Sequence, residues 1–430
     1  MGVLAALHPA ALPAVEITGR LQQELAYRIS DTRGFTKGLA FVQLEGAQQL
    51  GPRTRLTLIG RAWYDPVLDM RPPGALNPRL GAGDAYKDAF RSAELKEAYL
   101  DVLTEAVDLR LGRQIVRWGV LEGARITDRV NPLDFREFLF RDVEDRYIPL
   151  WMARANWYPG PLLVQLLVIP DMTFHKPAPP GSEWEEFQLP PDTRRPSVSP
   201  RHTEYGLLLG GRAGQTDLTA SYRYTWDDFP AAFRSVFGVS GQPTGVDFNP
   251  RYERLHVFGV TASRALGRTV GSFEAAYDHG KHLATDPGTL PASGDEIARD
   301  IARWGAGLDA NLAGVDVSLL YFQEHVIGWK PFIPVERVER AASVLVREEV
   351  LSNRVELRLL TLYFHTGRQY VVRPRVEYRW TDHVKLALGV DLLGGKRGSD
   401  PGDPDGVRDF RFVGYLKDHD RVDAALSYRF

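Results

Sequence analysis

Residues 370–380 read YVVRPRVEYRW, and their alternation decides how the fold is interpreted. Tyr370, Val376 and Tyr378 share one side of an extended chain, and Arg375 and Glu377 share the other, because successive side chains of a β-strand point to opposite faces. The next segment, residues 384–393, repeats this pattern. Each segment therefore predicts a strand with one apolar face and one charged face.

The same period of two runs through the chain after residue 14. We predict eighteen strands, with sixteen as the alternative if two segments between residues 329 and 364 merge. The predicted strands cover residues 15–29, 35–49, 53–64, 91–103, 106–114, 150–158, 162–169, 202–210, 216–226, 252–264, 269–278, 301–312, 315–328, 338–348, 354–364, 369–380, 384–393 and 420–430.

Two further patterns favour a membrane barrel over a soluble sandwich. Aromatic residues gather at the ends of the apolar faces, as girdle residues do at a membrane surface. Tight turns alternate with mostly long connections, which include residues 65–90, 115–149, 170–201, 227–251, 279–300 and 394–419. The sequence therefore predicts an all-β fold, a transmembrane antiparallel up-and-down β-barrel with short periplasmic turns and long extracellular loops.

Composition excludes several classes of protein. The 430 residues carry 53 Lys+Arg against 55 Asp+Glu, so a nucleic-acid partner is not expected. No Cys is present, which excludes disulfides, thiolate metal sites and covalently attached c-type haem. No nucleophile elbow, phosphate loop, dinucleotide fingerprint or metalloprotease motif occurs, so we predict neither an enzyme nor a cofactor.

The chain is expected to form one domain after a short leader. Residues 1–14 read MGVLAALHPAALPA, which indicates a signal peptide or a disordered tail without the usual basic start. Residues 15–430 would then form a single outer-membrane barrel domain.

Three stretches carry a resemblance to a known family. They are LGRQ at 111–114 with Trp118 and Gly119, TDRVNPLD at 127–134, and the end of the chain, LSYRF at 426–430. They resemble a family of poorly characterised proteobacterial outer-membrane β-barrels, similar in style to alginate-export porins. The resemblance implies a bacterial outer-membrane location, and it implies that Tyr428 and Phe430 form the signal read by the barrel-assembly machinery.

Residues 115–149 are the strongest candidate for a functional loop, because acidic and basic residues alternate densely along them. One hypothesis is a constriction folded into the lumen, where charged loops set pore selectivity. The alternatives are a solvated external loop, or a structural turn at the Asn-Pro step. The candidate constriction residues are Arg125, Asp128, Arg129, Asp134 and Arg136.

Charged residues on the inward faces of the strands are the second candidate site. Arginine binds carboxylates and phosphates through two parallel hydrogen bonds, so an arginine-rich wall suits an anionic solute. The alternative is a ladder of ion pairs that only holds the strands together. The predicted pore-lining residues are Arg223, Arg303, Asp309, Arg373, Arg375, Glu377 and Arg379.

Two loops carry weaker signals. His279 and His282 flank a turn after Asp278, a set too small to predict a metal site. Residues 227–251 suggest a short helical turn.

The favoured function is a porin-like channel that lets small solutes pass an outer membrane, with anionic charge of the solute as one hypothesis. The expected partners are outer-membrane lipid, the barrel-assembly machinery and the solute. A first alternative is a sleeve that holds a partner such as a multihaem cytochrome in an electron conduit. A second alternative is an adhesin or receptor that works through its long loops.

Overall fold

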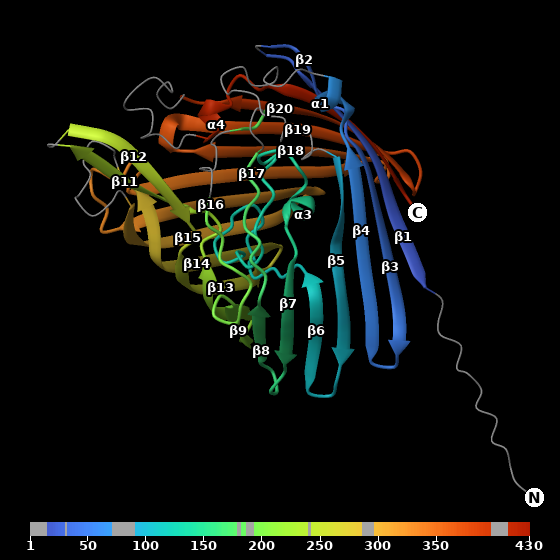
Figure 1. Ribbon diagram of the computed structural model, residues 1–430. Helices are drawn as coiled ribbons and strands as arrows, with labels where there is room; N and C mark the ends of the chain where they lie inside the picture. The colour runs from blue at the N-terminus through green and yellow to red at the C-terminus, as the bar shows by residue number, and fades with distance from the viewer. Residues whose placement is uncertain are drawn as a thin grey trace, which may run out of the picture.

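The computed structural model describes residues 15–30, 32–70, 91–178, 182–185, 193–239, 242–285, 296–396 and 412–430. These residues form a closed antiparallel barrel of eighteen strands, drawn in Figure 1. The barrel strands are β1 (Glu16–Arg28), β3 (Ala40–Gly51), β4 (Thr54–Tyr64), β5 (Arg91–Leu103), β6 (Val107–Gln114), β7 (Leu150–Trp157), β8 (Leu163–Ile169), β9 (Glu204–Ala213), β10 (Thr216–Trp226), β13 (Arg254–Leu266), β14 (Thr269–Ala284), β15 (Glu296–Leu312), β16 (Val315–Ile327), β17 (Val338–Val350), β18 (Val355–Phe364), β19 (Gln369–Arg379), β20 (Val384–Gly394) and β21 (Arg421–Arg429).

The predicted count of eighteen is confirmed, and the alternative of sixteen is wrong. β17 and β18 stay separate because residues 351–354 make a tight turn. Three consecutive non-glycine residues of this turn, Leu351, Ser352 and Asn353, have positive φ angles. Such angles reverse the chain within four residues. The two strands then pair in antiparallel register from Val350 opposite Val355.

The barrel closes between its first and last strands, which lie side by side in Figure 1. Nine residues of β1 pair with β21, from Arg20 opposite Arg429 to Arg28 opposite Arg421. The other edge of β1 pairs with β3 and then with the short strand β2 (Gly34–Lys37), so the predicted strand at 35–49 is interrupted at residues 38 and 39. Closure removes the free sheet edges that hydrocarbon cannot solvate.

The connections segregate by length. Turns at one end of the barrel are short, whereas those at the other end are long, except that β18 and β19 are joined by the short helix η2 (Thr366–Arg368). The other helices in the part of the chain that the structure describes are the short α1 (Pro66–Met70), α3 (Val143–Arg146) and α4 (Phe412–Tyr415). None of the helices in the described ranges is long and apolar enough to cross a membrane.

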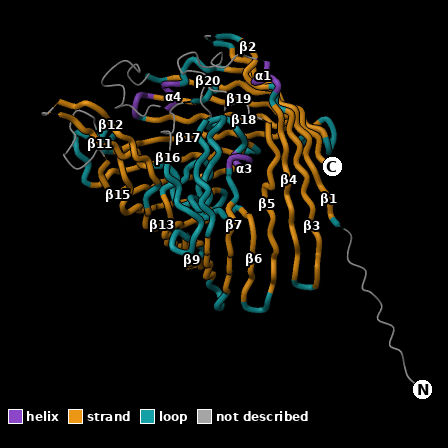
Figure 2. Tube along the Cα trace, viewed as in Figure 1, coloured by secondary structure: helices purple, strands orange, loops and turns teal. Residues whose placement is uncertain are grey.

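The loop between β10 and β13 differs from the prediction. It forms a hairpin of β11 (Ala231–Val239) and β12 (Gln242–Arg251), so the suggested helical turn is wrong. Figure 2 draws this hairpin as strands projecting from the barrel.

The outward face of the barrel is apolar along the strands. Leu308, Leu319 and Leu388 point away from the lumen and are 46%, 48% and 65% exposed in the isolated protein. Tyr378, Trp380, Tyr428 and Phe430 lie exposed near the short-turn end. An apolar band with such aromatic residues at its edge is the surface that a barrel presents to lipid, so the outward face of this barrel is suited to a membrane.

The buried core lies inside the barrel. One cluster packs Val116, Trp118 and Val130 of the 115–149 loop against Leu167 and Leu208 of the wall, with Leu150, Met152 and Ile169 around them. A second cluster packs Phe138, Phe140 and Trp184 against Val371 and Leu393. Loop side chains and wall side chains therefore share one interior.

Candidate functional site

The loop at residues 115–149 lies inside the barrel. Asp145 accepts a hydrogen bond from Arg20 of β1 at 2.9 Å, and the carbonyl oxygen of Tyr147 accepts one from Lys96 of β5 at 2.5 Å. Arg129 pairs with Asp278 of β14 at 2.6 Å, and β14 lies far from β1 and β5 around the barrel. Only a segment in the lumen touches strands on opposite sides of a closed barrel, and Figure 2 shows this teal loop among the strands.

One buried carboxylate attaches the loop to the wall. Glu274 of β14 is 0% exposed and accepts hydrogen bonds from the backbone nitrogen atoms of Val120, Leu121 and Thr127 and from the Thr127 hydroxyl. The Leu121 bond is 2.7 Å long and the two Thr127 bonds are 3.0 and 2.7 Å. Donors to an ionised oxygen make stronger bonds than donors to a neutral one, so Glu274 holds the first turn of the loop.

Glycines on the inner wall make room for the loop. A Cβ atom on Gly305 of β15 would lie 2.7 Å from Cδ1 of Ile126, and one on Gly307 would lie 2.7 Å from Cδ2 of Leu121. A Cβ atom on Gly259 of β13 would lie 2.9 Å from Cγ2 of Thr127. These three wall glycines, called the glycine seat below, let loop side chains contact the wall backbone.

Arg125 and Asp128, two of the predicted constriction residues, organise the loop itself. Arg125 donates to the carbonyl oxygens of Asp128 and Asn131 at 2.8 and 2.5 Å. Asp128 accepts from the backbone nitrogen of Trp118 at 3.3 Å and from the phenol of Tyr147. Burial raises the pKa of Tyr147 to about 12, and the Asp128 carboxylate acts in the same direction.

Arg129 joins two of the predicted pore-lining residues. Asp278 of β14 is 0% exposed and pairs with Arg129 and with Arg303 of β15, at 2.6 and 2.5 Å. Arg223 of β10 donates to the carbonyl oxygen of Arg129. The fold thus brings Arg129, Arg223 and Arg303 together around one carboxylate, although they are 94 and 80 residues apart in turn.

Asp134 and Arg136, the remaining loop candidates, pair with each other. Arg136 donates to Asp134 from Nε at 2.9 Å, and Arg141 approaches the same carboxylate at 3.2 Å. Burial alone would raise the pKa of Asp134, but the guanidinium groups of Arg136 and Arg141 hold it well below its usual range. Asp134 therefore stays ionised and ties the loop together at neutral pH.

The other predicted wall residues have carboxylate or ammonium partners on neighbouring strands. Arg373 pairs with Asp391 at 2.7 Å, Arg375 with Asp423 at 2.5 Å, and Arg379 with Glu349 at 2.7 Å. Glu377 faces Lys385 at 3.9 Å. These contacts are compatible with the predicted ladder of ion pairs as well as with a pore lining.

Asp309 does not join this network. It lies on the inward face of β15, six residues closer to the short turns than Arg303, which is on the order of 20 Å along a strand. It has no ion pair within the part of the chain that the structure describes. The pore-lining and constriction roles of all these residues remain predictions.

Glu274, Lys37 and Lys96 hold the loop but were not singled out from the sequence. Lys37 of β2 pairs with Glu24 of β1 and with Glu137 of the loop, the latter at 2.6 Å. Each was visible only as a polar residue on the inward face of a strand. Their loop partners lie 51 to 154 residues away, so no local signal identifies them.

The histidine pair lies within strand β14 and not in a loop as predicted. His279 contacts Asp300 at 2.9 Å, while Asp278 is occupied by the two arginines. Across the described ranges, no three metal-ligating side chains of His, Asp or Glu lie close enough to hold an ion.

The chain terminus closes the barrel. Phe430 donates from its backbone nitrogen to Gly19 at 3.1 Å and accepts from Gly19 at 2.9 Å. Its ring fills the space that a side chain on Gly19 would need, and it stacks on Tyr428 with ring centroids 5.9 Å apart. Whether the assembly machinery reads these two residues remains a prediction.

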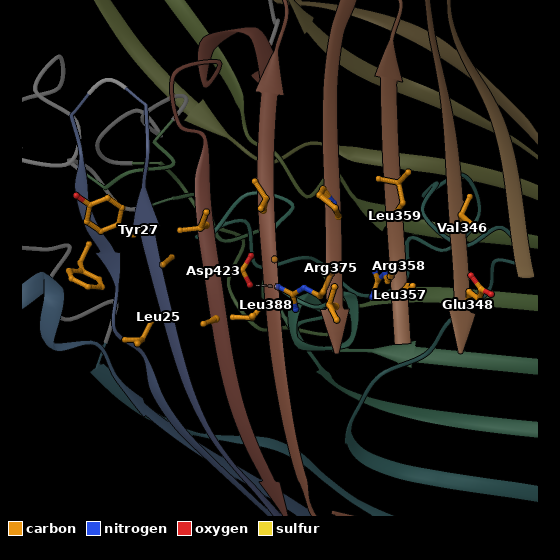
Figure 3. Close-up of a pocket in the computed structure, with 18 residues that line it drawn as sticks. Leu25, Tyr27, Val346, Glu348, Leu357, Arg358, Leu359, Arg375, Leu388 and Asp423 are labelled. Carbon is orange, nitrogen blue, oxygen red and sulfur yellow. Dashed lines mark hydrogen bonds and ion pairs between the residues drawn. The ribbon is translucent and has the colours of Figure 1, made fainter. Parts of the chain in front are cut away.

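An apolar concavity of about 750 Å³ lies across β17 to β1 (Figure 3). Most of its lining side chains, such as Leu25, Leu359 and Leu388, belong to the outward face. Most of its lining therefore faces lipid chains, while Arg358, Arg375 and Asp423 border it from the lumen face.

Comparisons with known proteins agree with the barrel. The sequence profile of the family described as "Protein of unknown function (DUF1302)" matches residues 35–303, more than half of the chain. A comparison with curated proteins finds no match.

Among solved structures, OccK8 (OprE) of Pseudomonas aeruginosa aligns with a TM-score of 0.57 and 8% identity, over 97% of this chain and 98% of that one. OccAB2 of Acinetobacter baumannii aligns with a TM-score of 0.55 and 10% identity, over 98% and 99%. OccK2 (OpdF) of P. aeruginosa, solved in complex with glucuronate, aligns with a TM-score of 0.55 and 11% identity, over 97% and 98%.

At these identities the likeness is one of fold, and it extends over the whole barrel. The profile match, by contrast, is a match of sequence, and it includes the inward loop with its Asn131-Pro132 step. This chain is therefore an outer-membrane β-barrel that belongs to the DUF1302 family.

Proposed function

We propose that this protein is a porin-like channel that lets small solutes cross the outer membrane, with residues 115–149 as its constriction. The observation that carries the proposal is the attachment of this loop to β1, β5 and β14 across the lumen. A charged loop fixed inside a barrel narrows the path and sets its selectivity. The fold shared with the Occ barrels supports the same reading.

Anionic solutes are the class that the charges favour. Arg125, Arg129 and Arg223 lie at the loop, and Asp228, which follows β10 in their field, has its pKa raised to about 6 by burial against the opposing pull of these arginines. Positive potential in a narrow path raises the local concentration of anions. OccK2, which shares the fold, was solved with glucuronate, a carboxylate.

The loop also bears on the sleeve alternative. A barrel that encloses a cytochrome needs a lumen wide enough for a second protein, and here Trp118, Phe140 and Trp184 occupy interior space. A partner cytochrome therefore remains an alternative without a supporting contact. The barrel-assembly machinery as a partner, the lack of enzymatic activity and the likeness to alginate-export porins stay predictions as well.

The test is the conductance of the refolded protein in a planar lipid bilayer, with reversal potentials in a salt gradient. We expect steady channels that favour anions. A variant that replaces residues 119–145 by a short Gly-Ser linker should conduct several-fold more current and lose much of this preference, because the path widens and its charges are removed.

Migration of the unheated protein in gel electrophoresis provides the control that the variant still forms a barrel. Folded protein that never conducts would refute the channel. Equal conductance of the wild type and the loop-deleted barrel would refute the constriction.

A further inference from the structure

Three arginines lie side by side on the lumen face of β17, β18 and β19. Arg347 is opposite Arg358, and Arg358 is opposite Arg375, in the antiparallel register of these strands. Paired residues of neighbouring strands have Cα atoms about 4.5–5.5 Å apart. Three like charges at this spacing repel one another, so the row needs negative charge nearby.

The two outer members of this arginine row have carboxylate partners. Arg375 reaches across β20 to Asp423 of β21 at 2.5 Å, and Figure 3 shows the two side chains turned toward each other. Gly389 of β20 lies between them and leaves their path clear, since a Cβ atom there would lie 2.6 Å from an Asp423 oxygen. Arg347 approaches Glu356 at 3.9 Å.

Arg358, at the centre, has no such partner. Within the described ranges no carboxylate forms an ion pair with it, and no hydrogen bond satisfies its guanidinium group. The charged groups that act on it are Arg347, Arg373 and Arg375, which repel it, and Asp142, which attracts it. Arg358 is half-buried, and a partly desolvated guanidinium group without a carboxylate partner is a group that an incoming anion would stabilise.

The 115–149 loop brings a second unpaired cation toward this region. Arg146, on α3, has a buried Nε atom without a hydrogen-bond partner. Burial, with Arg125 and Arg373 acting in the same direction, lowers the pKa of Arg146 to about 10. The charges of Arg373 and Asp142 act on both Arg146 and Arg358.

The depth of the site follows from the register. Arg373 donates to the carbonyl oxygens of Leu139 and Phe140 in the loop, at 3.4 and 3.2 Å. The arginine row lies two residues closer to the short turns than Arg373, which is roughly 7 Å along the strand. A solute that has passed the loop from the outside therefore meets Arg358 next.

We propose that Arg358, at the centre of the arginine row, forms a binding site for the oxyanion group of a solute, a carboxylate or a phosphate, directly below the loop. The site rests on the proposed channel, and it names the group that the channel selects. The planar guanidinium fork matches the two oxygens of either oxyanion. Chloride, which has no such geometry, is bound less well.

The test uses inorganic phosphate and succinate as probes, each added to the wild-type channel in potassium chloride. Either anion should reduce the chloride current in a saturable manner. Arg358→Gln should raise the half-blocking concentration about tenfold or more, as expected for loss of one charge-assisted contact. Arg358→Lys keeps the charge without the planar fork, so its half-blocking concentration should lie between those of the wild type and Arg358→Gln. This variant replaces Arg358→Gln in the test if Arg358→Gln does not fold.

A matched control is available on the opposite part of the wall. Arg110 of β6 also faces the lumen, but it is paired with Asp101 at 2.6 Å. Arg110→Gln should leave the half-blocking concentration unchanged. Block of the wild type by one probe alone would identify the oxyanion as carboxylate or phosphate and support the site.

Calorimetric titration of the detergent-solubilised barrel with the same anions does not depend on conduction. Binding that Arg358→Gln weakens supports the site even if no current is seen, in which case the channel alone fails. A conducting wild type that neither anion blocks or binds, or equal affinity of Arg358→Gln, overturns the site and leaves the channel standing.

Discussion

Asp228 shows how one residue can tune the charge of the lumen. It follows β10 and lies 3.8 Å from His175, in the field of Arg125, Arg129 and Arg223. Burial raises the pKa of Asp228 to about 6, although the arginines oppose the shift. Burial also lowers the pKa of His175 well below its usual range, so this imidazole stays neutral where Asp228 titrates.

The pH dependence follows from the sign of this shift. Below pH 6 Asp228 is protonated and one negative charge beside the arginines is lost, whereas Asp278 still pairs with Arg129; above pH 6 the Asp228 charge offsets part of theirs. We expect anion selectivity, read from reversal potentials, to rise as pH falls from 7 to 5. Asp228→Asn should show the low-pH selectivity already at pH 7.

Asp65 supplies the control for this titration. Burial raises the pKa of Asp65 to about 6 as well, and its carboxylate accepts from the backbone of Gly38 at 3.0 Å. Asp65→Asn should therefore keep the pH step if Asp228 causes it. A step that survives Asp228→Asn would refute this assignment.

At the scale of elements, the inward loop depends on the glycine seat. The chain places small residues on β13 and β15 where loop side chains touch the wall, and it places Glu274 on β14 between them. This part of the wall is shaped for one loop conformation, because a Cβ atom at Gly305 or Gly307 would overlap Ile126 or Leu121.

Gly305→Leu should therefore displace the loop. We expect larger and noisier single-channel currents, because the constriction loses its attachment while the barrel strands remain paired. Gly46→Leu is the matched control, since a Cβ atom at Gly46 of β3 meets nothing within 4 Å. Currents of Gly305→Leu that match those of the control would show that the seat does not hold the loop.

For the whole molecule, closure joins the two ends of the sequence. β1 and β21 pair along nine residues, and two backbone hydrogen bonds between Gly19 and Phe430 extend this pairing to the end of the chain. A barrel that fails to close exposes backbone groups to hydrocarbon, where each unpaired group is costly.

Removal of the Phe430 ring should therefore lower assembly in the membrane. Phe430→Ala is expected to reduce the amount of folded barrel in outer-membrane fractions several-fold, measured by heat-dependent migration in gel electrophoresis. Phe273→Ala, which removes a lipid-facing ring 41% exposed on β14, should assemble normally. Equal yields of the two variants would argue against a terminal assembly signal.

The alternation of side chains by itself determined the strands of this protein and their faces. All eighteen predicted segments correspond to barrel strands, because a strand in a membrane barrel must alternate between lipid and lumen over its whole length. The suggested helical turn at 227–251 is wrong, because residues 231–239 and 242–251 form the paired strands β11 and β12.

Only the tertiary structure decided the position of the loop and the register of charges between strands. The sequence left residues 115–149 either inside or outside, since the acids and bases that hold them lie on distant strands. The sequence likewise did not distinguish Arg358 from the other arginines on the inward faces of the strands. Its place between Arg347 and Arg375 depends on strand register, which is set by turns and closure and not by alternation within one strand.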